Sequence, residues 1–252
     1  MILSDKIIVF DFDGVVCDST DECMVTSWNA WEKWEKRNNF RYSVNEFPEE
    51  EKSIFRSMRP YVKGAGEYYI LRRLLKENIP FRGQDTFDSL GKEWLNFLPA
   101  FKEVFFECRE IFRSKDLYSW IELHPVFSEV IVTMQRLNNE NRLFIATLKD
   151  GESVKLILQY HGIKIESSQM IDQSQVRTKL EALDLIRERL GCAKSDMIFL
   201  DDNYTHLISP HKADYLVYLT SWGNIVPEFI EAAKENSIPI ADMAILRKML
   251  GF

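Results

Sequence analysis

Two aspartates separated by one residue stand near the start of the chain, in the segment Lys6–Thr20 (KIIVFDFDGVVCDST). The apolar run Ile7–Phe10 before them is typical of a strand buried on both faces. Because side chains two residues apart on a strand point the same way, Asp11 and Asp13 are expected to project into one pocket. Neighbouring carboxylates repel each other, and Mg²⁺, which takes oxygen ligands and keeps waters for a phosphate, would offset that repulsion. The alternative is an Asp-Gly turn after a core strand, since Gly14 permits a sharp exit.

Polar residues also follow two later apolar strands. The strand Arg142–Thr147 ends in a hydroxyl residue, and the run Met197–Leu200 is followed at once by Asp201 and Asp202. Because the carboxyl ends of neighbouring parallel strands share one edge of a sheet, Thr147 and the four aspartates are expected in one crevice with a nearby lysine. Such a cluster of anions needs a bound cation and a lysine to be tolerable.

Strands that alternate with helices predict a parallel sheet covered on both faces. Further strands are expected at Gln169–Asp172, Asp214–Leu219 and Pro239–Ile240, and an amphipathic helix at Lys179–Leu190. From about residue 20 to residue 117 the pattern is helical and rich in aromatic residues, with no credible strand. The predicted fold class is therefore α/β, with a discontinuous Rossmann-like core at residues 1–17 and 122–252 and an inserted α-helical domain at residues 18–121.

Bulk composition narrows the function classes. The chain has 252 residues, of which 46% are hydrophobic and 28% charged, as in soluble globular proteins. A net charge of −7 argues against a nucleic-acid partner, because phosphate backbones require a basic face. No apolar stretch approaches the roughly 18–20 residues of a membrane span, and the N-terminal segment lacks a signal-peptide core. We therefore expect no membrane partner and a cytoplasmic location.

The cysteines and histidines carry no metal-site signature. None of the four cysteines forms a CxxC pair, so buried reduced thiols are expected. None of the four histidines shows a spacing such as HExxH. His124 and His206 lie near the expected active-site loops, and we interpret both as packing or surface histidines.

The order of these motifs resembles that of the haloacid dehalogenase (HAD) superfamily. The motif DFDGVVCDS at residues 11–19 is followed by a strand-end threonine, a lysine and an acidic pair. The helical insert directly after the first motif is similar to the cap of the phosphoglycolate phosphatase and beta-phosphoglucomutase-like branch. The resemblance implies a Rossmann-like core with a cap that selects the substrate. It also implies phosphatase or phosphomutase chemistry, because dehalogenating relatives lack an acid/base aspartate at the position of Asp13 and transport ATPases carry threonine there.

The resemblance also implies a role for each motif residue. Asp11 would be the nucleophile that forms an aspartyl-phosphate, and Asp13 the general acid and base. Thr147 and Gly14 would contact the phosphoryl group. The implied ligands of Mg²⁺ are Asp11, the backbone carbonyl of Asp13, and Asp202, with Asp201 acting closely or through water.

The sequence leaves two questions open: which lysine neutralises the phosphate, and which cap residues contact the substrate. Lys179 has the family-like position, about thirty residues after the threonine and at the start of a helix, where it would neutralise the phosphate. Lys149 is the alternative candidate for this role. If Lys179 has the role, Lys149 would be a second phosphate contact, a cap contact or a surface lysine. In the cap, Arg59 and Lys63 could meet a carboxylate or second phosphate of the substrate, or could form an ordinary solvated helix end.

The sequence thus predicts a Mg²⁺-dependent phosphatase that hydrolyses a small phosphorylated metabolite, as a monomer or homodimer. The first alternative is a sugar phosphomutase of the beta-phosphoglucomutase type, which uses the same acid/base. A non-catalytic phosphate- or protein-binding module on the same fold is an alternative of another class. The presence of Asp13 argues against it, since binding alone has no need of an acid/base residue.

Overall fold

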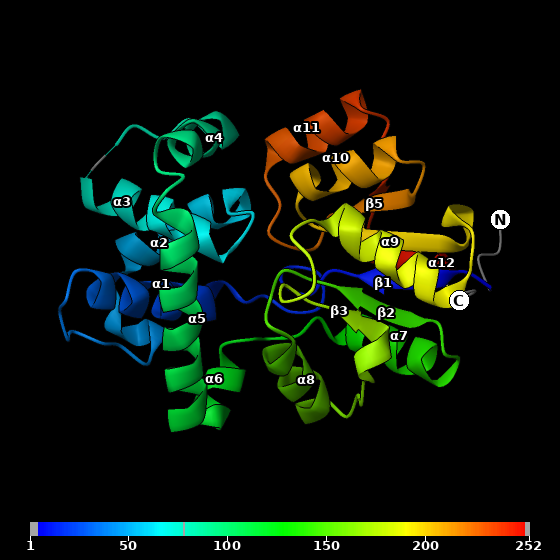
Figure 1. Cartoon of the computed structure of the whole chain (residues 1–252), viewed down its shortest axis with the longest axis horizontal. Helices are drawn as coiled ribbons and strands as arrows, with labels where there is room; N and C mark the ends of the chain where they lie inside the picture. Colours follow the sequence, from blue (N-terminus) through cyan, green and yellow to red (C-terminus); the bar gives the residue numbers. More distant parts are fainter. Residues whose placement is uncertain (1–4, 78, 250–252) are drawn as a thin grey trace. The chain divides into compact units, whose positions relative to one another are not determined.

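The structure is a computed structural model that describes residues 5–77 and 79–249. The chain divides into two compact units, one made of Met1–Asp18 and Val126–Phe252 and the other of Ser19–Pro125. The first unit is an α/β unit, and the second is helical and enters the chain between strands β1 and β2 (Figure 1).

A six-stranded parallel sheet, in the order β3-β2-β1-β4-β5-β6, forms the centre of the α/β unit. Its strands are β1 (Ile7–Phe10), β2 (Leu143–Ala146), β3 (Met170–Ile171), β4 (Met197–Asp201), β5 (Leu216–Thr220) and β6 (Ile240–Ala241). Every residue of β2 and β4 is buried, which explains why these strands are apolar without alternation. The predicted fold class, an α/β parallel sheet with a helical insertion, is confirmed.

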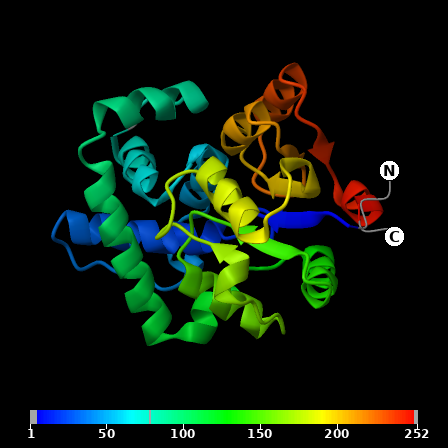
Figure 2. The same ribbon diagram turned by 45° about the vertical axis from the view of Figure 1, so that its right-hand side comes forward.

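Helices cover both faces of this sheet. One face carries α7 (Ser128–Asn139) and α8 (Gly151–Tyr160), and the opposite face carries α9 (Lys179–Leu190), α10 (Tyr204–Lys212) and α11 (Pro227–Glu235) (Figures 1 and 2). The chain runs outward from β1 to β2 and β3, and then in the other direction from β4 to β5 and β6. Right-handed crossovers therefore place the two groups of helices on opposite faces. The strand order reverses between β1 and β4, where doubly wound sheets bind ligands.

Local sequence signals set the ends of the helices that matter for the site. Thr178 caps α9 by accepting a hydrogen bond from the amide of Glu181, and Gly191 ends it in the left-handed conformation. Asn203 caps α10 by accepting a hydrogen bond from the amide of Thr205. The sequence analysis did not predict α10, because this short helix buries only Leu207 and Pro210 and so lacks a clear apolar stripe.

The helical unit packs around an aromatic core. Its helices are α1 (Thr20–Trp34), α2 (Glu49–Met58), α3 (Tyr68–Glu77), α4 (Gln84–Glu93), α5 (Leu98–Lys115) and α6 (Leu117–Glu122), with three short 3-10 turns between them. Tyr68 stacks on Phe105 with the ring centroids 4.8 Å apart, and Phe101, Phe112 and Trp120 are fully buried. Burial of such large rings is a strong driving force for packing.

The boundary of the helical unit lies later than the sequence placed it, at Pro125 rather than residue 121. Helix α6 joins this unit because the indole of Trp120 donates to Glu22 Oε1 over 3.4 Å. The same carboxylate accepts two hydrogen bonds of 2.8 Å from Arg109. His124 is buried in this unit too, with Nε2 at 3.8 Å from Glu22.

Two further expectations concern thiols and membranes. All four cysteines are free thiols, and Cys17, Cys23 and Cys108 are buried as expected. Cys192 departs from the expectation, because it is half-buried just beyond the end of α9. Among the helices that the structure describes, none is long and apolar enough to cross a lipid bilayer.

Candidate active site

Asp11 follows the last residue of β1, at the point where the strand order reverses. Its amide donates to the carbonyl of Leu200 in β4 over 2.8 Å, which holds the residue at the edge of the sheet. Carboxylate atom Oδ1 accepts a 2.7 Å hydrogen bond from the amide of Phe12 and lies 2.5 Å from Lys179 Nζ. In the described part of the chain no hydrogen bond reaches Oδ2. The carboxylate is thus fixed through one oxygen, and the other remains available.

Lys179 is the first residue of α9 and is only 3% exposed. Its ammonium group contacts the ends of three strands: Asp11 Oδ1 at 2.5 Å, Asp201 Oδ2 at 3.3 Å and the carbonyl of Ala146 at 2.9 Å. Three oxygens match the three donors of an ammonium group. Burial lowers the pKa of Lys179, but the carboxylates of Asp11 and Asp201 outweigh burial and raise it. The lysine therefore stays cationic inside the site.

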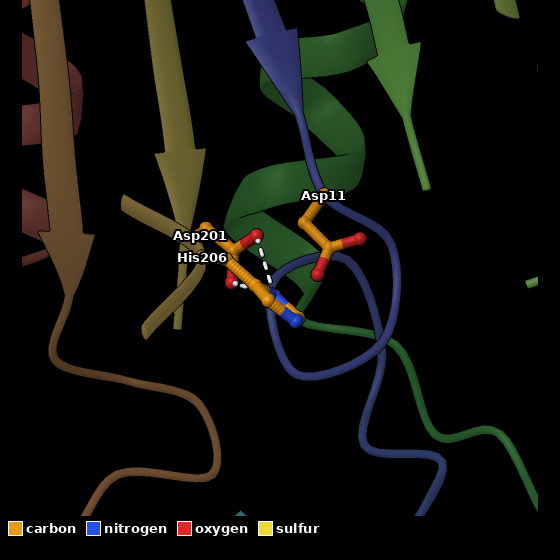
Figure 3. A group of neighbouring side chains, drawn as sticks. All are labelled: Asp11, Asp201 and His206. Atoms are coloured by element: carbon orange, nitrogen blue, oxygen red, sulfur yellow. Dashed lines mark hydrogen bonds and ion pairs between the residues drawn. The ribbon is translucent and has the colours of Figure 1, made fainter. Parts of the chain in front are cut away.

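Asp201 ends β4 and is fully buried beside Lys179. Its carboxylate accepts a 2.8 Å hydrogen bond from the amide of Asn203 and lies 3.2 and 3.3 Å from Nδ1 of His206 (Figure 3). Burial opposes ionisation, but Lys179 and His206 prevail and lower the pKa of Asp201 to about 2.

The pKa of Asp11 is shifted in the opposite direction. Burial, and then the negative charge of Asp201, raise the pKa of Asp11 to about 6 against the opposing effect of Lys179. Two carboxyl groups whose pKa values are pushed apart in one pocket are typical of sites that perform acid–base or nucleophilic chemistry.

Asp202 lies against the loops that follow β1 and β5. Its Oδ2 accepts a 2.8 Å hydrogen bond from the amide of Asn224. A Cβ atom on Gly14 would lie only 1.8 Å from the same oxygen, and Gly14 has a φ of +80°. Glycine is required there both for the turn and for the approach of the carboxylate. The loop after β1 is therefore shaped around Asp202.

Asp13 and Lys149 form a second pair in the α/β unit. Lys149 Nζ lies 3.1 Å from Asp13 Oδ1, and Lys149 is 2% exposed. Thr147, which follows β2 and is buried, accepts a 3.1 Å hydrogen bond from the amide of Lys149 through Oγ1. Both lysines that the sequence offered thus contact an aspartate of the first motif: Lys179 contacts Asp11, and Lys149 contacts Asp13.

The two cap residues singled out from the sequence have local partners within the helical unit. Lys63 Nζ lies 2.5 Å from Asp88 Oδ1 on α4. The guanidinium of Arg59 lies 5.8 Å from the ring centroid of Tyr68. Their role as substrate contacts therefore stays a prediction.

His206 is the residue that the sequence reasoning missed. It was interpreted as a packing or surface histidine, yet the structure places it beside Asp201. Asn203 is a typical helix N-cap. Recognising a helix that starts at Tyr204 would have placed His206 on its first turn, close to the acidic pair.

The acidic residues of the site are compatible with a metal ion. Asp11, Asp201 and His206 each offer one ligand atom, and these atoms lie within 4.8 Å of one another. Two buried carboxylates face one lysine, so a divalent cation would offset the remaining negative charge. Asp202 adds a further carboxylate at the neighbouring loop.

Fold and site together define a class of protein: doubly wound α/β proteins with carboxylates and a lysine at the carboxyl ends of the central strands. The sequence matches the family model of haloacid dehalogenase-like hydrolases over residues 6–214. The chain belongs to this family, as its motifs predicted. A search of curated proteins found no match.

Solved structures share the whole fold at low sequence identity. A candidate phosphoglycolate phosphatase from Lactobacillus delbrueckii subsp. bulgaricus has a TM-score of 0.64 at 14% identity, covering 99% of this chain and 100% of its own. A predicted phosphoglycolate phosphatase from Haemophilus somnus has a TM-score of 0.61 at 16% identity, covering 98% of both chains. A hydrolase of the haloacid dehalogenase-like family from Streptococcus pneumoniae has a TM-score of 0.56 at 14% identity, covering 95% of this chain and 93% of its own. At these identities the likeness establishes the fold.

Proposed function

We propose that this chain is a Mg²⁺-dependent phosphatase that hydrolyses a small phosphate monoester through an aspartyl-phosphate. The observation that carries the proposal is the contact of Lys179 with both Asp11 and Asp201, at 2.5 and 3.3 Å. Phosphoryl transfer depends mainly on positioning and on neutralising charge. The buried Lys179 both positions the carboxylate of Asp11, which would attack phosphorus, and neutralises negative charge beside it.

In the first step, Asp11 acts as the nucleophile. Its Oδ2 attacks phosphorus while Oδ1 stays held by Lys179 and the amide of Phe12. The bond from phosphorus to the ester oxygen breaks, and Asp13 gives its proton to the leaving alcohol. In the second step water attacks the phosphorus, the bond to Asp11 breaks, and Asp13 takes the proton of the water.

Lys149 lies beside the proposed acid and base, with Nζ 3.1 Å from Asp13 Oδ1. In this scheme Asp13 enters the first step protonated, gives that proton to the leaving alcohol, and regains a proton from the attacking water in the second step. Lys149 offers a second positive charge to the phosphate dianion.

The buried carboxylates of Asp11 and Asp201, with Asp202 beside them, would hold the metal. A bound Mg²⁺ would supply positive charge to the phosphoryl oxygens. The hydroxyl of Thr147, at the end of β2, would donate a hydrogen bond to the phosphoryl group. The substrate class that fits is a small phosphorylated metabolite.

The experiment is phosphate release from p-nitrophenyl phosphate and a panel of metabolite monoesters, with Mg²⁺ or with EDTA. We expect release that needs Mg²⁺ and is abolished in Asp11→Asn. Asp13→Asn should lower the rate by about 10²–10⁴-fold, the usual contribution of a general acid and base. Asp196→Asn is the matched control, because this exposed aspartate pairs with Lys6.

The alternatives give different results in the same experiment. A phosphomutase would release little phosphate until a bisphosphate primer is added. A non-catalytic module would bind phosphate esters and show no turnover with or without a primer. Full activity in Asp11→Asn would overturn the proposed mechanism.

A further inference from the structure

Helix α10 brings an imidazole to the carboxylate pair at the centre of the site. The ligand atoms of Asp11, Asp201 and His206 lie within 4.8 Å of one another, and Figure 3 shows His206 beside Asp201 and on the side of Asp11. Nothing in the proposed phosphoryl transfer uses this histidine. Its place beside two candidate metal ligands therefore needs a reason.

The contact between His206 and Asp201 is long and symmetric. Nδ1 lies 3.3 Å from Oδ1 and 3.2 Å from Oδ2. Nδ1 thus forms a hydrogen bond to each carboxylate oxygen, and both are longer than the usual length of about 2.7–2.9 Å for a charged pair. The same spacing allows one cation to bind Nδ1 and a carboxylate oxygen together.

Charge around the group also fits a divalent cation. Asp11 and Asp201 are both buried, and Lys179 approaches them through Asp11 Oδ1 and Asp201 Oδ2. Lys179 offsets one of these two carboxylate charges, and a divalent cation would offset the other.

We propose that His206 is a nitrogen ligand of the metal site, so that the site is a mixed nitrogen and oxygen site that binds Mn²⁺ more tightly than Mg²⁺. The inference rests on the proposed function and changes the metal preference expected from the aspartates alone. Mg²⁺ binds mainly through oxygen ligands and keeps its waters. Imidazole suits first-row transition ions such as Zn²⁺, Fe²⁺ and Ni²⁺, whereas Mn²⁺ also takes the oxygen ligands that Mg²⁺ takes, so Mn²⁺ serves as the probe of a mixed site.

The N-terminal cap of α10 holds His206 in its position beside Asp201. Asn203 accepts hydrogen bonds from both the amide and the hydroxyl of Thr205, at 3.0 and 2.6 Å. This cap fixes the first turn of α10, on which His206 lies. His211 lies on the same helix, outside the carboxylate group, and serves as the matched control.

The test measures the nitrogen directly on the intact chain. Purified metal-free protein is loaded with Mn²⁺, and electron spin echo spectroscopy detects nitrogen nuclei bound to the ion. We expect nitrogen coupling in the original chain and in His211→Ala. We expect its loss in His206→Ala and in His206→Gln, a variant that keeps a polar side chain if the alanine variant folds poorly.

Affinity gives the second readout. The dissociation constant of Mn²⁺ should rise at least about 10–100-fold in His206→Gln, because loss of a mere outer-shell partner of a metal ligand already costs that much. The dissociation constant of Mg²⁺ should change much less. Mn²⁺ that binds the original chain without nitrogen coupling would overturn the inference, as would equal losses of Mn²⁺ and Mg²⁺ affinity.

These outcomes separate the inference from the proposed function. Absent nitrogen coupling together with phosphate release that needs Asp11 would reject His206 as a ligand and leave the phosphatase proposal standing. Nitrogen coupling together with no phosphate release from any ester would support the metal site and reject the phosphatase.

Discussion

Lys179 Nζ lies 2.5 Å from Asp11 Oδ1, and the same ammonium group reaches the ends of β2 and β4. A single buried cation therefore links three strands of the sheet at the point where their order reverses. Lys149 has a different partner, since it lies 3.1 Å from Asp13 Oδ1. The sequence offered two lysines for one position, and the structure gives each of them a separate aspartate.

Replacing the two lysines should therefore have different effects. Lys179→Met leaves Asp11 and Asp201 as a buried pair of like charges, so we expect a loss of about 3–5 kcal/mol in the free energy of unfolding. Lys149→Met should cost less stability, because Asp13 is partly exposed. Urea denaturation in EDTA measures the stabilities, and single-turnover assays with p-nitrophenyl phosphate measure phosphoryl transfer.

We expect Lys179→Met to abolish the transfer to Asp11, and Lys149→Met to slow it. Lys155→Met is the control, since this lysine donates to Ser167 at the exposed surface of the α/β unit. Loss of transfer in Lys149→Met alone would exchange the roles of the two lysines.

The raised pKa of Asp11 predicts how stability depends on pH in metal-free protein. Burial and the charge of Asp201 raise this pKa from 3.8 to about 6. Between about pH 4 and pH 6 the native state then holds more protons than the unfolded chain. The contribution of Asp11 is therefore present below about pH 4 and is lost as the pH rises through about 6.

Asp11→Asn removes this titration. In EDTA, the variant should gain stability relative to the original chain as the pH rises from about 4 to about 7. Urea denaturation at several pH values measures the difference. A constant difference over this range would contradict the prediction, and Asp196→Asn controls for the general effect of removing a carboxylate.

Gly14→Ala tests the approach of Asp202 to the loop after β1. The added Cβ would lie 1.8 Å from Asp202 Oδ2, at a φ of +80°. We expect the variant to displace Asp202, to weaken Mg²⁺ binding at least about tenfold, and to lose phosphate release. Isothermal titration with Mg²⁺ measures the affinity.

Gly191→Ala separates the space requirement from backbone strain. Gly191 has a φ of +62°, and an added Cβ meets nothing within 4 Å. It should cost about 1–2 kcal/mol of stability, the usual cost of left-handed backbone for a side chain, and leave metal binding unchanged. Equal effects of the two substitutions on Mg²⁺ affinity would show that the contact with Asp202 is unimportant.

The buried pair of Glu22 and Arg109 should dominate the stability of the helical unit. Their side chains are 0% and 4% exposed and are joined by two hydrogen bonds. Glu22→Ala leaves the guanidinium buried without its carboxylate, so we expect a loss of about 3–5 kcal/mol. Glu107→Ala removes an exposed ion pair with Lys33 and should cost less than about 1 kcal/mol. Urea denaturation compares the two variants, and similar losses would contradict the prediction.

Much of the fold follows from local sequence patterns. The apolar runs of β1, β2 and β4 predict buried parallel strands, because only strands covered on both faces are apolar without alternation. Thr178 and Gly191 mark the two ends of α9 through capping. The short helix α10 and the terminal helix α12 (Met243–Met249) escaped prediction, since neither has a long apolar stripe.

The sequence by itself determined the family and the set of polar residues at the strand ends, because the motif spacing and the parallel sheet bring those ends to one edge. Only the tertiary structure decided how these residues pair. It placed Asp201 beside Lys179 and Asp11, set the carboxylate of Asp202 against Gly14, and brought His206 to the carboxylates. The position of a polar residue in the sequence determines which strand it follows, and therefore at which strand end it lies. The direction of its side chain depends on the crossing helices and loops, which come from distant parts of the sequence.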